Sequence, residues 1–133
     1  MSAIQRFEDI ESWKKGRELT RRVYVHSDTG KFARDFGLRD QMRRASVSVM
    51  SNIAEGFERD GNKEFRQYLY VAKGSAGEFR SLLYVALDAG YFDQAVFDEL
   101  TAMALDAIRL LDGFIRYLDR CDMSGRKFAG PDA

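Results

Sequence analysis

Apolar residues recur at alternating steps of four and three through the second half of this chain, without a break over two long stretches. The first stretch covers residues 65–86 and the second covers residues 97–118. This spacing places every repeated residue on one side of an α-helix, and it is typical of the seam between packed helices. The two stretches therefore predict two long helices that pack against other helices. Their repeated residues are Phe65, Leu69, Ala72, Ala76, Phe79, Leu83 and Ala86, followed by Phe97, Leu100, Ala104, Ala107, Leu111, Phe114 and Leu118.

The first half of the chain contains two further helical patterns. The only proline is Pro131, so no obligatory helix breaker interrupts either pattern. The two helices are expected to run from Asp9 or Ser12 to His26, and from Leu38 to Gly56 or Arg59. Their apolar positions are Ile10, Trp13, Thr20, Val23 and Tyr24 in the first helix, and Leu38, Met42, Ala45, Val49 and Ile53 in the second.

Turn and capping residues separate the four expected helices. Asn62 follows a run with turn chemistry and is predicted to cap the N-terminus of the third helix. Gly90 is expected to end that helix, and Asp93 to cap the fourth. The longer segment SDTGKFARDFG is expected to form a loop before Leu38.

Four long helices joined mostly by short turns predict an all-α fold, an antiparallel up-down-up-down four-helix bundle. We expect residues 1–121 to form this single domain, and residues 122–133 to form a disordered C-terminal tail. The N-terminal residues are too polar for a signal peptide, and no apolar run reaches the roughly 18 residues that a membrane span needs. The expected location is therefore the cytoplasm, without a membrane partner.

The chain lacks the residue groups that metal or covalent catalysis requires. His26 is its only histidine and Cys121 its only cysteine, so neither the Glu-x-x-His pairs of di-iron bundles nor a zinc site can be assembled. Glu55 and Glu78 are candidates for a carboxylate pair, but hydrogen-bonded or ion-paired structural roles are favoured. We therefore expect no metal, no cofactor and no enzymatic activity.

The second helix carries more apolar surface than one seam uses. At 100° per residue, four apolar residues fall away from the stripe that runs from Leu38 to Ile53. A wide apolar face can also contact two neighbours within one bundle. Burial against another subunit is favoured because a monomer seldom exposes a large contiguous apolar patch. The expected interface of a homo-oligomer therefore consists of Val47, Met50, Ala54 and Phe57.

A stripe of polar residues runs along the second helix beside its apolar seam. On the third helix, residues 72–78 are mostly small, and two of them, Gly74 and Gly77, each cost about 1 kcal/mol relative to alanine in mid-helix. Two such glycines suggest that another backbone comes close. We predict a polar network that joins the two helices and fixes their register, formed by Gln41, Arg44, Ser48, Asn52, Glu55, Ser75 and Glu78.

The formal net charge is zero, which argues against a surface that attracts nucleic acid everywhere. The charge is unevenly distributed, because residues 1–66 carry 14 Lys and Arg against 11 Asp and Glu, and residues 67–133 carry 7 against 10. Such a basic excess can follow the phosphates of RNA or DNA, without reading sequence. A solvated helix face is the alternative interpretation. The expected basic face on the first two helices consists of Lys14, Lys15, Arg17, Arg21, Arg22, Arg39 and Arg43.

Several motifs together resemble those of bacterial four-helix-bundle proteins encoded within intervening sequences of 23S rRNA genes, often described as ribosomal-protein-like. The resemblance covers about residues 7–118. The family commonly has a Phe-Pro pair where this chain has Phe32-Ala33, which affects the loop and not the bundle. The motifs are Phe7-Glu8-Asp9, Trp13-Lys14, Tyr24, Phe36-Gly37-Leu38, Gln41, Arg43-Arg44-Ala45, Ser48, Ser51-Asn52-Ile53-Ala54-Glu55-Gly56, Ala72, Gly74-Ser75 and Glu78.

The resemblance implies a small cytoplasmic bundle that assembles into a ring, commonly a pentamer, and has no known enzymatic activity. It also implies kinship with the accessory bundle protein of diversity-generating retroelements, a pentamer that binds nucleic acid and a reverse transcriptase through a basic surface. We therefore predict a non-enzymatic scaffold for RNA or for a nucleic-acid-handling complex, with a reverse transcriptase as a candidate protein partner. The alternative is a protein-interaction scaffold that uses the same basic face and binds no nucleic acid.

Overall fold

The computed structural model describes residues 4–121, and it is helical almost throughout. The prediction of an all-α protein is confirmed, and the described residues contain no strand. The prediction for the tail, residues 122–133, lies outside the described residues. In chain order the elements are the short 3₁₀ helix η1 (Phe7–Asp9), α1 (Glu11–His26), the short helix α2 (Gly30–Arg34), α3 (Phe36–Glu58), α4 (Asn62–Asp88) and α5 (Gln94–Asp119).

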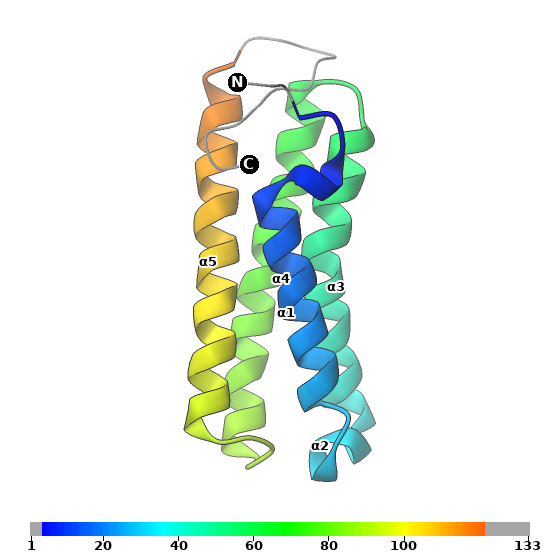
Figure 1. Ribbon diagram of the computed structural model, residues 1–133, viewed down its shortest axis with the longest axis vertical. Coiled ribbons are helices and arrows are strands. Elements are labelled where there is room, and N and C mark those ends of the chain that lie inside the picture. Colours follow the sequence, from blue (N-terminus) through cyan, green and yellow to red (C-terminus); the bar gives the residue numbers. More distant parts are fainter. Residues whose placement is uncertain (1–3, 122–133) are drawn as a thin grey trace.

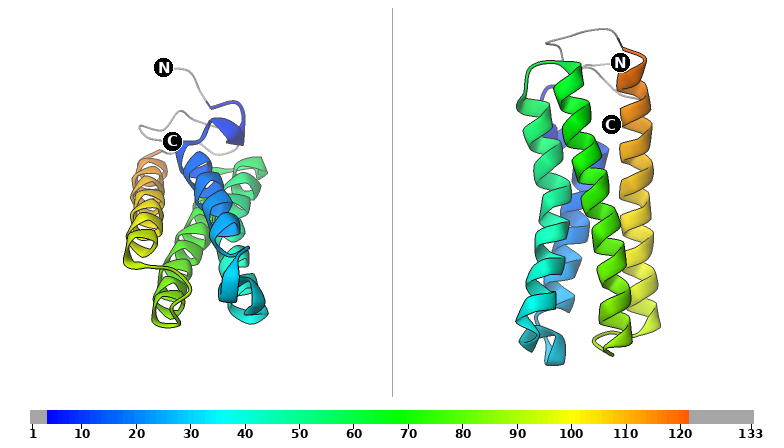
Figure 2. Two further views of the ribbon diagram at one scale, coloured as in Figure 1. Left: turned by 60° about the horizontal axis from the view of Figure 1, so that its bottom comes forward. Right: turned by 180° about the vertical axis from the view of Figure 1, so that it is seen from behind.

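The four long helices lie side by side along the long axis of the molecule, and the chain reverses direction between each one and the next (Figures 1 and 2). Helix α1 packs against α3 and α5, and α4 also packs against α3 and α5. Each long helix therefore has two neighbours, and the apolar stripes of all four face a common interior.

The apolar seams predicted for α3, α4 and α5 are buried without exception. Helix α1 differs, because its buried residues are Ser12, Gly16, Leu19 and Val23, whereas Tyr24 is exposed. The prediction for this helix was right for Ile10 and Val23, which are buried, and wrong for Tyr24, and it missed Gly16 and Leu19. Ile10 is buried but precedes the helix in extended backbone, so its position says nothing about which face of α1 points inward.

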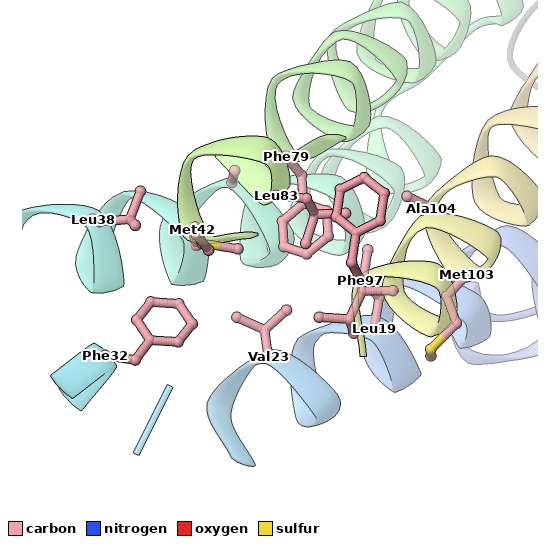
Figure 3. Packing of buried hydrophobic residues seen from close by; sticks show 13 residues of the cluster. Leu19, Val23, Phe32, Leu38, Met42, Phe79, Leu83, Phe97, Met103 and Ala104 are labelled. Atoms are coloured by element: carbon pink, nitrogen blue, oxygen red, sulfur yellow. The ribbon is translucent and has the colours of Figure 1, made fainter. Parts of the chain in front are cut away.

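The core consists of two clusters, one at each end of the bundle. Figure 3 shows the cluster at the α2 end, where Phe32 lies beside Val23 and Met42. Phe32 belongs to the segment that was expected to be a loop, so that expectation was wrong in part. Burial of Phe32 and its stacking on Tyr91, with ring centroids 5.2 Å apart, hold this segment as a helical turn over the end of the core.

Two glycines let the helices approach closely. A Cβ atom at Gly56 of α3 would lie 2.6 Å from Cβ of Tyr68 in α4, and a Cβ atom at Gly16 of α1 would lie 3.3 Å from Cβ of Met50 in α3. Real Cβ atoms do not come as close as the first distance. Glycine at position 56 therefore sets the spacing between α3 and α4 near the turn that joins them.

The helix ends follow the predicted capping residues in two cases out of three. The backbone N–H of Val96 donates to Asp93 Oδ1 at 3.0 Å, so Asp93 caps α5 as predicted. Gly90 has φ +75° and follows the last turn of α4, also as predicted. Asn62 does not cap α4, because Gly61 holds the N-cap position. The buried Asn62 side chain instead donates to the carbonyls of Leu118, at 2.9 Å, and Cys121, at 2.6 Å.

Candidate nucleic-acid interface

The basic residues of α1 divide into two groups whose directions differ by about 120° around the helix axis. At 100° per residue, Lys14, Arg17 and Arg21 share a sector of about 60° that points outward and toward α3. Arg22 points toward α5, where it contacts Glu99, and Lys15 lies about 20° from it around the helix and pairs with Glu18 at 3.7 Å. The structure therefore does not gather the five predicted α1 residues on one surface.

The outward group of α1 borders a surface hollow of about 560 Å³. Trp13 lies in its wall, and the 3₁₀ helix η1 closes one side, where the Phe7 ring meets the indole edge-on with centroids 5.2 Å apart. The Arg17 guanidinium lies over the indole, 5.9 Å from the ring centroid. The sequence alone did not indicate this hollow, because it depends on how η1 folds back on α1. The lining residues are Arg6, Glu8, Trp13, Lys14, Arg17, Glu18 and Arg21.

The cations around the hollow are only weakly neutralised by the protein. Arg17 and Arg21 are exposed and form no ion pair with any residue in the range 4–121. Lys14 lies 2.9 Å from Glu11, and both side chains are more than half exposed. Exposed pairs of this kind contribute about 0 to 1 kcal/mol, so a phosphate group can replace the carboxylate at little cost.

Arg22 is engaged within the bundle. Its Nε atom donates to Glu99 of α5 at 2.7 Å, and its Nη2 atom lies 3.1 Å from Nε2 of His26. The hydrogen bond from Arg22 lowers the pKa of Glu99, which keeps this carboxylate charged. Arg22 thus bridges α1 and α5, which makes it a poor candidate for binding phosphate. Its partner is 77 residues away in the sequence, which is why local spacing could not reveal it.

Arg43 and Arg39 are held at the other end of the bundle. The Nε atom of Arg43 donates to Ser27 Oγ at 2.8 Å, and its guanidinium lies 4.4 Å from the ring centroid of Tyr24. Arg39 donates to the carbonyl of Ala33 and pairs with the neighbouring aspartate. Both residues hold the connection between α1 and α3. Of the seven predicted phosphate-binding residues, the structure therefore leaves Lys14, Arg17 and Arg21 as the group best placed to meet a ligand.

The predicted polar network forms in part. Ser48 of α3 and Ser75 of α4 share a hydrogen bond of 2.8 Å, and Asn52 Nδ2 donates to both Oγ and the carbonyl of Ser48. The Ser48–Ser75 bond thus joins α3 to α4, and Asn52 supports Ser48 from within α3. Gln41, Arg44 and Glu78 lie on the surface beside Ser48, around a small hollow of about 140 Å³.

Glu55 lies outside this network. It accepts hydrogen bonds from Arg59 at 2.9 Å and from the hydroxyl of Tyr68 at 3.1 Å, and both interactions lower its pKa. A carboxylate stabilised in its charged form is a poor proton donor at neutral pH. Glu78 contacts a different set of residues, so the structure does not bring the two carboxylates together as an acid–base pair.

The four expected interface residues lie in three environments. Phe57 is buried in the core of its own chain, where its ring meets that of Phe65. Met50 is half-buried beside Gly16 of α1, Ala54 is also half-buried, and Val47 is exposed. A second apolar set lies on the outer side of α4, where four large side chains are about half exposed: Tyr70, Val71, Tyr84 and Val85.

Within residues 4–121 no three His, Cys, Asp or Glu side chains come together in a way that could hold a metal ion. His26 contacts Arg22 and Glu99, and Cys121 lies at the end of α5. None of the helices in this range has the length and apolar character needed to cross a bilayer.

The comparisons with known proteins agree with this architecture. A model of the family described as 23S rRNA-intervening sequence protein matches residues 8–113. The chain belongs to this family. A crystal structure of a protein of unknown function from the S23 ribosomal protein family of Bacteroides thetaiotaomicron has a similar fold, with a TM-score of 0.73 at 19% sequence identity. The similarity covers 79% of this chain and 98% of the Bacteroides protein. Among proteins with curated descriptions, none matches this chain.

Proposed function

We propose that this member of the 23S rRNA-intervening sequence protein family is a non-enzymatic cytoplasmic scaffold that binds nucleic acid, with RNA as the favoured ligand. The observation that carries the proposal is the group of three outward cations on α1, of which Arg17 and Arg21 have no ion pair in the described chain. Cations in this state can exchange water and counterions for phosphate oxygens without breaking an interaction that the fold needs. Binding through phosphates gives affinity without sequence preference.

We propose further that the four-helix unit is an antiparallel bundle that assembles into a homo-oligomer, and the family resemblance favours a pentameric ring. Exposed Val47, with half-buried Met50 and Ala54, supplies apolar surface on α3 for such contacts. A ring would present the α1 cations several times on one particle. Multivalent contact of this kind raises avidity by orders of magnitude, even when each contact is weak.

The test compares two double variants that change the net charge equally. Arg17→Glu with Arg21→Glu reverses two of the three outward charges, and Arg109→Glu with Arg116→Glu makes the same change on exposed residues of α5. Fluorescence anisotropy with a labelled single-stranded RNA should show at least about tenfold weaker binding for the α1 variant alone. Its slope of log affinity against log salt should also fall by about two. Equal losses in both variants would mean that net charge, and not this surface, determines binding.

Oligomeric state is measured separately by size-exclusion chromatography with light scattering and absorbance at 260 and 280 nm. A mass several times the 15.2 kDa of one chain, with excess absorbance at 260 nm, is the expected result for protein purified at low salt. A monomer would contradict the ring and remove the avidity argument.

A protein-interaction scaffold is the second candidate, and the outer side of α4 favours it. Tyr70 and Val71 lie about half exposed near one end of this side, and Tyr84 and Val85 near the other. Large apolar side chains exposed on the outer side of one helix can serve as contact points for a protein partner. Nuclease treatment separates the two candidates, because a captured partner that remains bound after complete digestion of nucleic acid is held by protein contacts.

A further inference from the structure

The hollow beside α1 combines an aromatic wall with cations at its rim. The indole of Trp13 is half-buried, and the edge-on contact with Phe7 fixes its position on the core. Lys14, Arg17 and Arg21 follow each other along α1 over about 10 Å, at a rise of 1.5 Å per residue. A fixed aromatic ring beside a short row of cations differs from a merely solvated basic helix face, which needs no aromatic group.

This combination matches the two parts of a nucleotide. Every base has a flat aromatic face that can stack on an indole, and every phosphate carries the charge that arginine binds. The Arg17 guanidinium lies over the indole, 5.9 Å from its centroid. A base that stacks on this face therefore displaces the guanidinium, which remains close enough to bind the phosphate of the same nucleotide. The volume of about 560 Å³ is in the range of small-molecule sites.

We infer that the hollow lined by Trp13, Lys14, Arg17 and Arg21 is a binding site for an unpaired nucleotide of single-stranded RNA. This inference rests on the proposed function and adds to it the form of the ligand. In a duplex the bases are stacked on each other and their faces are not free, so a duplex can use only the cations. A single strand can use both the cations and the indole.

An acidic peptide is the competing occupant, since it could also meet the cations. The carboxylates of Glu8 and Glu18 in the lining disfavour an acidic peptide and a phosphate backbone alike. The indole decides between them, because an aromatic base is part of every nucleotide and aromatic side chains are only occasional in acidic peptides. The observations therefore favour the nucleotide.

Trp13 is the only tryptophan of the chain, so its fluorescence reports on this hollow alone. The experiment titrates the protein with three probes: a ten-nucleotide single-stranded RNA, an abasic ribose-phosphate strand of the same length, and poly-glutamate. The RNA should quench Trp13 emission and should bind about tenfold more tightly than the abasic strand. The abasic strand should bind without comparable quenching.

Two variants complete the test with labelled RNA and anisotropy as the readout. Trp13→Leu should bind the base-bearing RNA about tenfold more weakly and the abasic strand equally well, and Trp13→Phe should recover part of the loss. The control Tyr70→Leu removes an exposed aromatic side chain from the outer side of α4 and should change neither affinity. Circular dichroism checks that each variant is folded, and quenching in the unmodified protein gives the answer if Trp13→Leu does not fold.

The outcomes separate this inference from the proposed function. If both strands bind equally and Trp13 emission does not change, the nucleotide site is refuted, while binding of nucleic acid through phosphates stands. If neither strand binds, both proposals fail. If poly-glutamate quenches Trp13 as strongly as the RNA does, the hollow belongs to an acidic protein partner and the nucleotide site is refuted.

Discussion

A methyl group added at Gly56 should force α3 and α4 apart, whereas the same group added at Gly74 should stabilise the protein. At position 56 the new Cβ atom would lie 2.6 Å from Cβ of Tyr68 and 3.0 Å from Cδ1 of Phe65. A Cβ atom is fixed to the backbone, so the first contact can be relieved only if one helix moves. At Gly74 no atom lies within 4 Å of the added group.

The expected magnitudes follow from two opposing effects. Replacing a mid-helix glycine by alanine adds about 0.5 to 1 kcal/mol of stability when nothing obstructs the methyl group. Overpacking a close contact costs about 1 to 3 kcal/mol. Gly74→Ala should therefore raise the free energy of unfolding by up to about 1 kcal/mol, and Gly56→Ala should lower it by about 1 to 2 kcal/mol. Each kcal/mol of difference in unfolding free energy between the two variants should correspond to a difference of about 3 to 5 °C in Tm.

Urea denaturation followed by circular dichroism at 222 nm measures both changes, and light scattering measures the assembly. If Gly56→Ala is as stable as Gly74→Ala, the helix spacing argued from Gly56 is wrong. The Gly74→Ala variant also tests whether another subunit contacts α4, because Gly74 is exposed in the single chain. If Gly74→Ala reduces the assembled mass, another subunit approaches α4 at this position, and the gain in stability will appear only in the dissociated chain.

Three smaller predictions concern interactions between helices. Asn62→Ala should lower the free energy of unfolding by about 1 to 3 kcal/mol in urea denaturation, because two carbonyls at the end of α5 lose their donor. Glu99→Gln should make Tm less sensitive to acid. Hydrogen bonding from Arg22 lowers the pKa of Glu99 in the folded protein below its ordinary 4.5. The Arg22–Glu99 pair therefore stabilises the fold fully above pH 4.5, and this stabilisation is lost as the pH falls through the folded-state pKa. Ser48→Ala should cost about 1 kcal/mol by removing the bond to Ser75, and a double variant with Ser75→Ala should cost less than the sum of the two single changes.

The sequence was sufficient to predict most of the core of α3, α4 and α5, because their apolar residues keep one helical phase from end to end. It assigned Phe57 to a subunit interface, although this residue is buried in the core of its own chain. It was not sufficient for α1, where Leu19 and Gly16 face the core between charged neighbours. A buried glycine carries no hydrophobic signal, and its role appears only when α3 packs against it. Phe32 was also missed, because it is buried by residues that are distant in the sequence, such as Tyr91.

The candidate site also depends on tertiary contacts that the sequence pattern does not reveal. Spacing along one helix was enough to group Lys14, Arg17 and Arg21, because residues three and four apart share a face. It could not show that Arg22 is bound to Glu99, which comes from α5. It also treated Trp13 as one more apolar residue of the helix face, because the contact with η1 that forms the hollow is a tertiary contact.

Zero net charge does not argue against nucleic-acid binding by this protein, because what matters is which charges are already paired. On the α5 side of α1, Arg22 is neutralised by Glu99, and at the C-terminal end of α1 the Tyr24 ring is covered by Arg43. Both arrangements stabilise the bundle, so a ligand would have to break them. In the N-terminal half of α1, Arg17 lies over the Trp13 ring of the same helix and forms no ion pair with any residue in the range 4–121. In the proposed site, a ligand with one aromatic and one anionic group would displace Arg17 from the indole, but it would break no ion pair between helices.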